Sequence, residues 1–336
     1  MNEVLLGIDP RGQSVPALVW AADEAVRRGL ALRLVVAVPP AHEGLRYDAL
    51  AHQRALRIRA ESAITRAEDL VRELHGGLRI ATERVNGVPA TVLRHMAEHA
   101  ALVVVGSRRL GRMAEVFSEN SVVVPLTARA SCPVVVVRAP EHTTVHPPTL
   151  VVGVDGSESA RAAVAFAVEE ASLRGARLRA VRVRLPSVRA RDDLDEDPAE
   201  RRRPSAGSVA EWAERCPDII VTPEVLLGDP VEQLALASRG SLALIVGRRG
   251  RGGCSGMRLG STVHGLLHRA ACPVITVPLP QHGGRTGDPA GAERPRSLRT
   301  ERPRTAGPLG TGAPWPPGGT VGREDGPGPS DGLPER

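Results

Sequence analysis

The sequence predicts an α/β protein made of two tandem doubly wound domains, each with a parallel β-sheet flanked by helices. Two observations predict this class. Short apolar runs rich in β-branched residues alternate with helix-length amphipathic stretches, and the whole alternation occurs twice along the chain. Alternating strands and helices form right-handed βαβ units, which place their strands parallel in one sheet.

The chain contains an internal repeat. Three segments of its first half reappear in the same order, at an offset of 140–146 residues: 3–38 matches 150–183, 87–109 matches 228–250, and 130–140 matches 270–280. Solenoid repeats are far shorter, so this period indicates duplication of a whole domain. We therefore divide the chain into copy one (residues 1–140), copy two (148–280) and a tail (281–336).

Apolar runs predict the strands of copy two at residues 150–154, 219–225, 242–246 and 273–277. Their continuous apolar character is typical of strands buried on both faces. In copy one, residues 47–74 predict a long second helix. The matching part of copy two is interrupted by the mixed-charge residues 189–207, which we expect to form a mobile loop.

The segment 158–175 predicts the first helix of copy two. The apolar residues expected to share much of its buried face are Ala162, Ala165, Phe166, Val168 and Ala171. Gly175 follows as a C′ glycine, the residue type that ends helices with a left-handed backbone.

Composition limits both the core and the chemistry. Apolar residues make up 42% of the chain and aromatic residues only 2%, so the cores must be aliphatic. The chain has no lysine, and all 44 basic residues are arginines. Schiff-base chemistry, a lysine general base and a P-loop lysine are therefore excluded. The net charge of +6 is spread along the chain, so it gives little support for a nucleic-acid partner.

The sequence favours a cytoplasmic protein. Its N-terminus does not resemble a signal peptide, no apolar run approaches the roughly 18–20 residues that span a bilayer, and its four cysteines show no CxxC spacing. We expect no membrane partner. The tail after Pro280 is rich in Gly, Pro and Arg without apolar periodicity, so we expect it to be disordered and to contribute nothing to folding.

Residues 246–262, VGRRGRGGCSGMRLGST, hold six glycines between an apolar run and a helical segment. In an open α/β sheet, ligands bind beyond the carboxyl ends of the strands. A glycine loop there brings backbone N–H groups close to phosphate, and the next helix adds a partial positive charge. Ser261 and Thr262 are residue types that cap helices, and their hydroxyls can also bind phosphate.

The glycine segment allows three other interpretations. An RGG-type nucleic-acid segment is usually interleaved with aromatic residues, whereas this one lies between a core strand and a helix. A plain structural turn remains open, although seventeen residues are many for a strand–helix connection. A Walker A loop is excluded because it needs a lysine.

The segment resembles the nucleotide motif of the universal stress protein family, G-2x-G-9x-G-[S/T]. Gly247, Gly250, Gly260 and Ser261 match it, and "VVGVDGS" and "ACPV" extend the likeness, which covers about residues 1–280. The resemblance implies two five-stranded parallel sheets of order 3-2-1-4-5 and binding of ATP, or another adenine nucleotide, with or without Mg²⁺.

The resemblance also implies roles for single residues of copy two. Asp155 would contact the nucleotide near the ribose or base, although the same carboxylate can simply cap the next turn. The backbone of Val183 would meet the adenine edge. Gly247, Gly250, Gly260, Ser261 and Thr262 would hold the phosphates and ribose.

Copy one departs from this pattern. Asp9 and Gly106 are kept, but Arg109 replaces the second glycine, and Glu119-Asn120 replaces the third glycine and serine. A side chain at the second position crowds the phosphate path if the backbone there needs positive φ. Glu119 adds a negative charge where phosphate would lie. We expect copy one to serve packing or pairing and not nucleotide binding.

We therefore expect a nucleotide-binding regulatory protein, not a dedicated enzyme, with slow incidental ATP hydrolysis at most. The alternative is a scaffold that binds no nucleotide and acts through domain pairing and partner recruitment. The last strand of each copy is expected at a sheet edge, where the two copies pair within the chain as a pseudo-dimer. A homodimer of whole chains is compatible with this arrangement.

Two weaker patterns favour structural roles. His95 and His99 fit H-x-x-E-H, one helical turn apart, but we expect a solvated or capping helix face and no zinc site. Cys132 and Cys272 each precede a proline at a predicted strand and are expected to pack in the core. Cys254 lies in the glycine loop, where a space-filling role is preferred over a reactive thiol.

Overall fold

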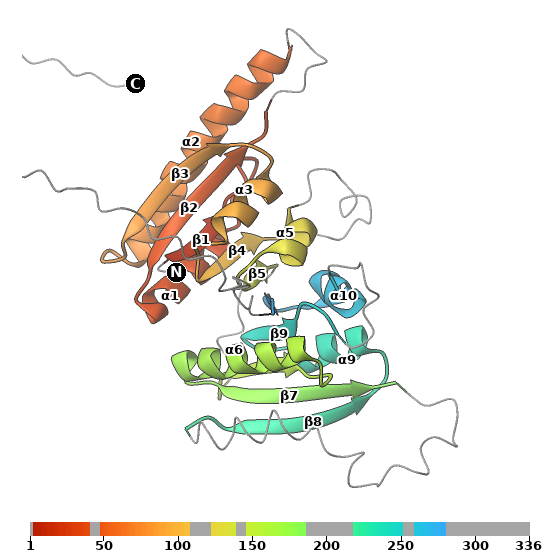
Figure 1. Cartoon of the computed structure of the whole chain (residues 1–336). Coiled ribbons are helices and arrows are strands. Elements are labelled where there is room, and N and C mark those ends of the chain that lie inside the picture. Colours follow the sequence, from red (N-terminus) through yellow and green to blue (C-terminus); the bar gives the residue numbers. More distant parts are fainter. Residues whose placement is uncertain are drawn as a thin grey trace, which may run out of the picture. The chain divides into compact units, whose positions relative to one another are not determined.

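The computed structural model describes residues 3–40, 48–107, 122–138, 146–185, 218–250 and 259–279. These residues form one ten-stranded sheet with helices on both faces (Figure 1). The sequence predictions that lie outside the described residues concern the tail, the segment 189–207, Arg109, Glu119, Asn120, Cys216 and Cys254.

Nine elements build the described part of copy one. They are β1 (Glu3–Gly7), α1 (Val15–Arg28), β2 (Ala31–Val38), α2 (Asp48–Leu74), β3 (Ile80–Asn86), α3 (Pro89–Met96), β4 (Leu102–Gly106), α5 (Val123–Arg129) and β5 (Val134–Val137). The long second helix predicted over 47–74 is α2, within one residue of its expected bounds.

Eight elements build the described part of copy two. They are β6 (Thr149–Gly153), α6 (Glu158–Arg174), β7 (Arg177–Arg184), β8 (Val221–Leu227), α9 (Pro230–Ala237), β9 (Ala243–Gly247), α10 (Ser261–Arg269) and β10 (Val274–Val277). Gly175 ends α6 at φ 57° and donates its N–H to the Ala171 and Ser172 carbonyls, as a C′ glycine should.

The strand order of the sheet is β3-β2-β1-β4-β5-β10-β9-β6-β7-β8. Each half therefore has the predicted order 3-2-1-4-5, and all neighbours within a half are parallel. The halves meet where β5 and β10 pair antiparallel, with Val134 opposite Thr276 and Val136 opposite Val274. This pairing agrees with the expected pairing of the two copies through their last strands.

Two aliphatic layers of core cover the two faces of this sheet. Along β1, Val4 and Leu6 point into the layer under α1, α2 and α6, whereas Leu5 points into the layer under α3, α5, α9 and α10. Successive strand residues face opposite sides, so a buried strand can supply both layers. Within the described ranges, no helix is both long enough and apolar enough to cross a bilayer.

The buried face predicted for α6 is confirmed in part, because Val168 and Ala171 are buried and Ala162 and Phe166 pack against the core. The fully buried apolar residues of α6 are Ala160, Ala163, Val164, Ala167, Val168 and Ala171, whereas Ala162, Ala165 and Phe166 are only partly buried. The reason is that α6 has a second neighbour besides the sheet. Phe166 lies under the guanidinium of Arg28 from α1, so apolar residues occur on both sides of the helix.

The strand predicted at 219–225 also needs correction. Strand β8 begins two residues later, at Val221, and its residues are partly buried or exposed. It is not buried on both faces because it lies at the end of the ten-stranded sheet, where only β7 pairs with it.

A ring of four charges, formed by Glu24, Arg28, Glu170 and Arg174, joins α1 to α6. Each glutamate contacts the arginine four residues later on its own helix. Each also contacts the arginine of the other helix: Arg174 Nη2 lies 2.7 Å from Glu24 Oε2, and Arg28 Nη2 lies 2.6 Å from Glu170 Oε2. The two glutamate side chains are fully buried, and that of Arg174 is 2% exposed.

The charge ring follows the internal repeat. Glu170 and Arg174 lie 146 residues after Glu24 and Arg28, the offset of the first strand and helix in the two copies. The aromatic residues beside the ring keep the same offset. The guanidinium carbon of Arg174 lies 5.1 Å from the ring centre of Trp20, and that of Arg28 lies 5.4 Å from that of Phe166.

Candidate functional site

A cavity of about 370 Å³ opens at the carboxyl ends of the strands in copy two. It lies where β6 and β9 are neighbours, which is the point where the strand order reverses. All seven predicted site residues line it: Asp155, Val183, Gly247, Gly250, Gly260, Ser261 and Thr262. Residues separated by more than one hundred positions in the sequence are thus brought to one site.

Backbone and hydroxyl contacts hold the two ends of the glycine segment at this cavity. Gly260 N donates to the Arg248 carbonyl at 3.1 Å, which closes the base of the segment. The first turn of α6 fixes its start, because Arg249 N donates to Ser159 Oγ at 3.2 Å and Ser157 Oγ donates to the Arg249 carbonyl at 3.4 Å. The end of β9 is therefore tied to α6.

The three motif glycines differ in what surrounds them. A Cβ on Gly247 would lie 2.5 Å from the Ser159 backbone, and one on Gly250 would lie 2.6 Å from Asp155 Oδ2. A Cβ on Gly260 would meet nothing closer than 3.5 Å. None of the three adopts positive φ. At Gly247 and Gly250 the requirement for glycine is therefore space and not left-handed backbone, whereas Gly260 has room for a side chain.

These surroundings predict different phenotypes for two single substitutions. Gly247→Ala forces a methyl group against backbone, so we expect a loss of about 1–3 kcal/mol in the free energy of unfolding. Gly250→Ala pushes only a movable carboxylate, so stability should change little while nucleotide affinity falls on the order of tenfold. Denaturant unfolding and calorimetric titration of both variants measure the two effects. Equal stability losses would contradict the assignment.

Helix α10 begins at the cavity without a side-chain cap. Gly260 is the N-cap residue, at φ −68°, and no side chain accepts a hydrogen bond from the first turn. Ser261 and Thr262 are the first two helical residues, so of the two roles that their residue types allow, neither hydroxyl caps α10. The first residues of α10 line the cavity, and the dipole of this helix favours an anion at its N-terminus.

Asp155 combines a local contact with a place at the cavity. Its Oδ1 accepts a hydrogen bond from Ser157 N at 2.9 Å. This contact is the turn-capping role that the sequence offers as the alternative to nucleotide binding. Asp9 in copy one makes the same contact with Arg11 N at 2.8 Å. The capping role is therefore present in both copies, and it leaves Asp155 Oδ2 next to Gly250.

Sequence reasoning missed several residues that line the same cavity. The largest are Leu185, Leu234, Leu259 and Arg249, and Pro230 and Val181 also line the cavity. Arg249 carried a usable signal, because it lies between the first two motif glycines. Leu259 carried one as well, because it directly precedes Gly260. The other apolar residues carried none, because strand and helix ends far apart in the sequence contribute them.

The remaining sequence candidates behave as structural residues. The side chain of His95 is 75% exposed, and its Nδ1 lies 3.8 Å from Glu98 Oε1. Helix α3 ends at Met96, so His99 lies beyond the helix and not one turn after His95 on it, as the sequence predicted. Among the described residues, no group of three His, Cys, Asp or Glu side chains is arranged to hold a metal ion. Cys132 and Cys272 are buried in the core as expected, and burial raises the pKa of Cys132 to about 12.

Fold and cavity together define a tandem doubly wound α/β protein with a cavity at the switch point of the sheet in copy two. The sequence model of the Universal stress protein family matches residues 1–138 and again 148–278. The chain therefore belongs to the universal stress protein family.

Relatives and solved structures agree with this assignment. Universal stress protein Rv2005c of Mycobacterium tuberculosis is 32% identical over 292 residues, covering 81% of this chain and 95% of the relative. Universal stress protein Rv2623 of the same organism is 31% identical over 298 residues, with the same coverage. A crystal structure of a universal stress protein from Archaeoglobus fulgidus covers 83% of this chain and 96% of its own, with a TM-score of 0.64 at 18% identity. The two-domain fold is thus found in a solved protein.

Proposed function

We propose that copy two binds one adenine nucleotide, preferably ATP, and that the protein acts as a nucleotide-dependent regulator in a stress response and not as an enzyme. One observation carries this proposal. The seven residues predicted for the nucleotide line a single cavity at the switch point of the sheet. Its volume of about 370 Å³ lies within the usual range for small-molecule sites.

The strand order divides the cavity into parts suited to the parts of a nucleotide. Strand β6 lies between β7 and β9, so Asp155 after β6 lies between Val183 on β7 and the glycine segment after β9. The apolar ends of β7 offer a surface for the base. Asp155 can accept hydrogen bonds from ribose hydroxyls. The glycines and the start of α10 offer backbone N–H groups to the phosphates.

Charge supports the same orientation. Arg249 and the positive end of the α10 dipole lie on the phosphate side. Asp155 is the one carboxylate among the described residues that line the cavity. A single carboxylate is a poor match for a dedicated Mg²⁺ site, so Mg²⁺ would enter bound to the phosphates, with Asp155 within reach as a ligand.

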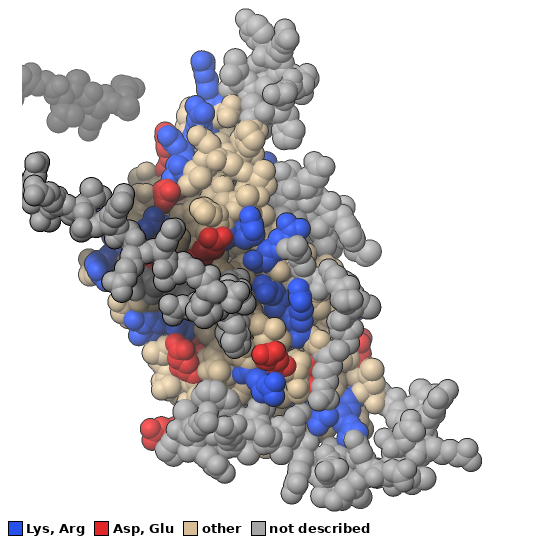
Figure 2. Space-filling view, in the orientation of Figure 1, with Lys and Arg blue, Asp and Glu red and all other residues tan. Residues whose placement is uncertain are grey.

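The described surface gives little support to nucleic acid as the ligand. Acidic side chains lie beside basic ones across the face drawn in Figure 2. Several arginines are also paired inside the molecule, as in the charge ring and in the contact of Arg33 with Glu3 and Glu83. A nucleic-acid site is expected to present an unpaired basic stripe.

The scaffold function remains the second candidate, because the β5–β10 pairing shows that the chain is built around domain pairing. Calorimetric titration of the full chain with ATP separates the two. We expect a stoichiometry near one, and release of an adenine nucleotide from the purified, denatured protein by mass spectrometry. A stoichiometry near two would place nucleotide in copy one as well. Absence of binding with no released nucleotide would favour the scaffold.

A further inference from the structure

Arg248 follows the first glycine of the nucleotide motif, but its side chain does not line the copy-two cavity. Gly247, Arg249 and Gly250 line that cavity, and Arg248 is absent from its walls. The guanidinium crosses instead to copy one, where Arg248 Nη1 donates to the carbonyl oxygen of Ala130 at 2.7 Å. The segment expected to hold phosphate is therefore tied to the other copy of the domain.

Three hydrogen bonds hold Arg248 at the base of the glycine segment. Its backbone N–H donates to the Val277 carbonyl of β10 at 3.0 Å, and its own carbonyl accepts from Gly260 N at 3.1 Å. The third is the side-chain bond to Ala130, which reaches copy one. Without this third bond, the residue that joins the two ends of the segment is held by its backbone alone.

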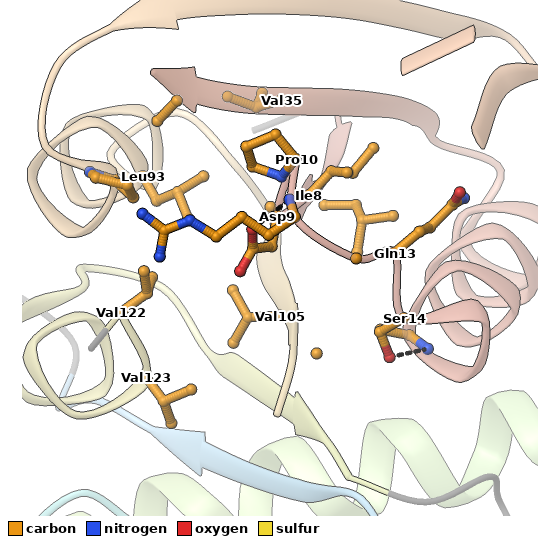
Figure 3. A pocket seen from close by; sticks show the side chains of 18 of the residues that line it. Ile8, Asp9, Pro10, Gln13, Ser14, Val35, Leu93, Val105, Val122 and Val123 are labelled. Carbon is orange, nitrogen blue, oxygen red and sulfur yellow. Dashed lines mark hydrogen bonds between the residues drawn. The ribbon is translucent and has the colours of Figure 1, made fainter. Parts of the chain in front are cut away.

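The acceptor belongs to a helix that is well packed in copy one. Ala130 is the C-cap residue of α5, and Val123, Leu126 and Ala130 itself are buried in the core. The other end of this helix borders a cavity at the strand ends of copy one, where Figure 3 shows Val122 and Val123. The last carbonyl groups of a helix lack partners within it and carry a partial negative charge, so they suit a guanidinium.

The electrostatic position of Arg248 makes this acceptor important. The side chain is partly buried next to Arg249, and burial together with the charge of Arg249 lowers the pKa of Arg248. A charged group that loses water needs hydrogen-bond partners in the protein. The Ala130 carbonyl therefore compensates part of the cost of keeping a guanidinium at this place.

The matching residue of copy one is a serine. Ser107 follows Gly106 as Arg248 follows Gly247, and Ser107 N donates to the Val137 carbonyl of β5 at 2.9 Å, as Arg248 N does to β10. The backbone is thus held in the same way in both copies, but a serine side chain is too short to reach the other copy. The arginine occurs in the copy with the intact glycine motif and not in the copy with the altered one.

We propose that Arg248 is a positioning residue, which fixes the glycine segment for the phosphates of the nucleotide by anchoring it to α5 of copy one. This inference rests on the proposed nucleotide site of copy two and adds to it a contribution from the other copy. Arg248 acts through the backbone of the segment, whereas Arg249 attracts the phosphates directly. Because the acceptor is a backbone carbonyl, the side chains of copy one can change without loss of the anchor.

Arg248→Met removes the anchor and Arg249→Met removes a charge at the cavity, so the two changes separate positioning from direct attraction. Both are compared with the parent full chain by calorimetric titration with ATP at low and at high salt. We expect Arg248→Met to weaken binding about tenfold at both, because one hydrogen bond that orders the segment is lost. The effect of Arg249→Met should shrink at high salt, because salt screens the attraction between an exposed charge and phosphate.

A second measurement needs no nucleotide. Hydrogen–deuterium exchange of single amides, followed by NMR, reports how firmly the ends of the glycine segment are held. The Gly260 and Arg249 amides, which donate to the Arg248 carbonyl and to Ser159 Oγ, should exchange faster in Arg248→Met than in the parent. The amide of Leu244 inside β9 donates to the Pro273 carbonyl and should keep its parent rate.

Arg138→Met is the matched control for a general weakening of the contact between the copies. Arg138 of copy one also crosses to the other copy, where it donates to the His268 carbonyl in the last turn of α10. That turn is at the opposite end of α10 from the residues that line the cavity. Arg138→Met should therefore leave ATP affinity and the exchange rate of the Gly260 amide unchanged.

Four results would overturn the proposal. In Arg248→Met they are unchanged exchange of the Gly260 and Arg249 amides, unchanged ATP affinity, or an affinity loss that shrinks with salt as in Arg249→Met. The fourth is an equal affinity loss in Arg138→Met. If the parent chain binds no ATP, the proposed function fails, and the exchange measurement still decides whether Arg248 holds the segment.

Discussion

Replacing Arg174 with methionine should lower the free energy of unfolding by about 3–5 kcal/mol, because it breaks a buried ion pair and leaves the other charge uncompensated. Arg174 contacts both Glu24 and Glu170, whose carboxylates are fully buried. Without Arg174, two carboxylates share the one remaining arginine of the ring. Methionine preserves most of the apolar volume, so the measured loss reports mainly the missing charge. Denaturant unfolding followed by circular dichroism measures it.

Replacing the whole ring provides the control. Changing both glutamates to leucine and both arginines to methionine removes every buried charge at once, and buried ion pairs replaced in this way often keep or gain stability. We expect the fourfold variant to be markedly more stable than Arg174→Met. If both lose the same stability, packing and not charge explains the single variant.

The two glutamates of the ring should also differ from each other. Burial tends to raise the pKa of Glu24, but Arg174 and Arg28 outweigh it and hold that pKa below its ordinary value. For Glu170, burial and the charge of Glu24 prevail over the arginines and raise its pKa. Glu24→Gln should therefore cost more stability at neutral pH than Glu170→Gln, which the same unfolding measurement can test.

Gly260→Glu should reduce ATP affinity by about a thousandfold or more. The position tolerates a side chain, because a Cβ there meets nothing closer than 3.5 Å, so the fold should survive. The new carboxylate would lie at the start of α10, where phosphates are expected. Two like charges about 4 Å apart repel by about 4 kcal/mol at an effective dielectric constant near 20, which corresponds to roughly three powers of ten in affinity.

Gly260→Gln is the matched control, because glutamine has nearly the same shape without the charge. It should weaken ATP binding far less than Gly260→Glu, and both variants should keep the melting temperature of the parent protein. Titration calorimetry and thermal unfolding of the three proteins measure these effects. Similar affinity losses for Glu and Gln would mean that the phosphates do not lie at this helix start.

The alternation of strands and helices and the internal repeat predicted two doubly wound halves, whereas the strand order and the set of site residues came from the resemblance to the universal stress protein family. How deeply each apolar residue of α6 is buried was not predictable from one helix alone. The helix has two neighbours, and only the tertiary structure shows that Phe166 packs against the core and also contacts Arg28 of α1. The start of β8 was predicted two residues too early. The apolar run in the sequence begins at Ile219 and Ile220, but the strand begins at Val221, and only the structure separates the two.

The cavity of copy one shows a different limit of prediction from sequence motifs. Its glycine motif is altered, and a comparison of motifs alone gives packing or pairing as the remaining role. Copy one nevertheless has a cavity of about 290 Å³ at its strand ends, and the sequence carried a signal for its shape. Pro16 lies in the first turn of α1 and Pro125 in that of α5, and proline fits the first turn of a helix but not later turns. These prolines act on the lining through helix length, so their effect becomes visible only when the strand ends and helix starts are assembled around one space.

The antiparallel pairing of β5 with β10 has a consequence for the evolution of the two copies. In a dimer of identical chains, every substitution appears at both sites simultaneously. Here the two paired copies belong to one chain and have different sequences. A mutation in the site of one copy therefore leaves the site of the other unchanged. Selection can therefore act separately on Gly250 in copy two and on Pro16 in copy one. Either copy can keep or lose a ligand while the other copy stays unchanged.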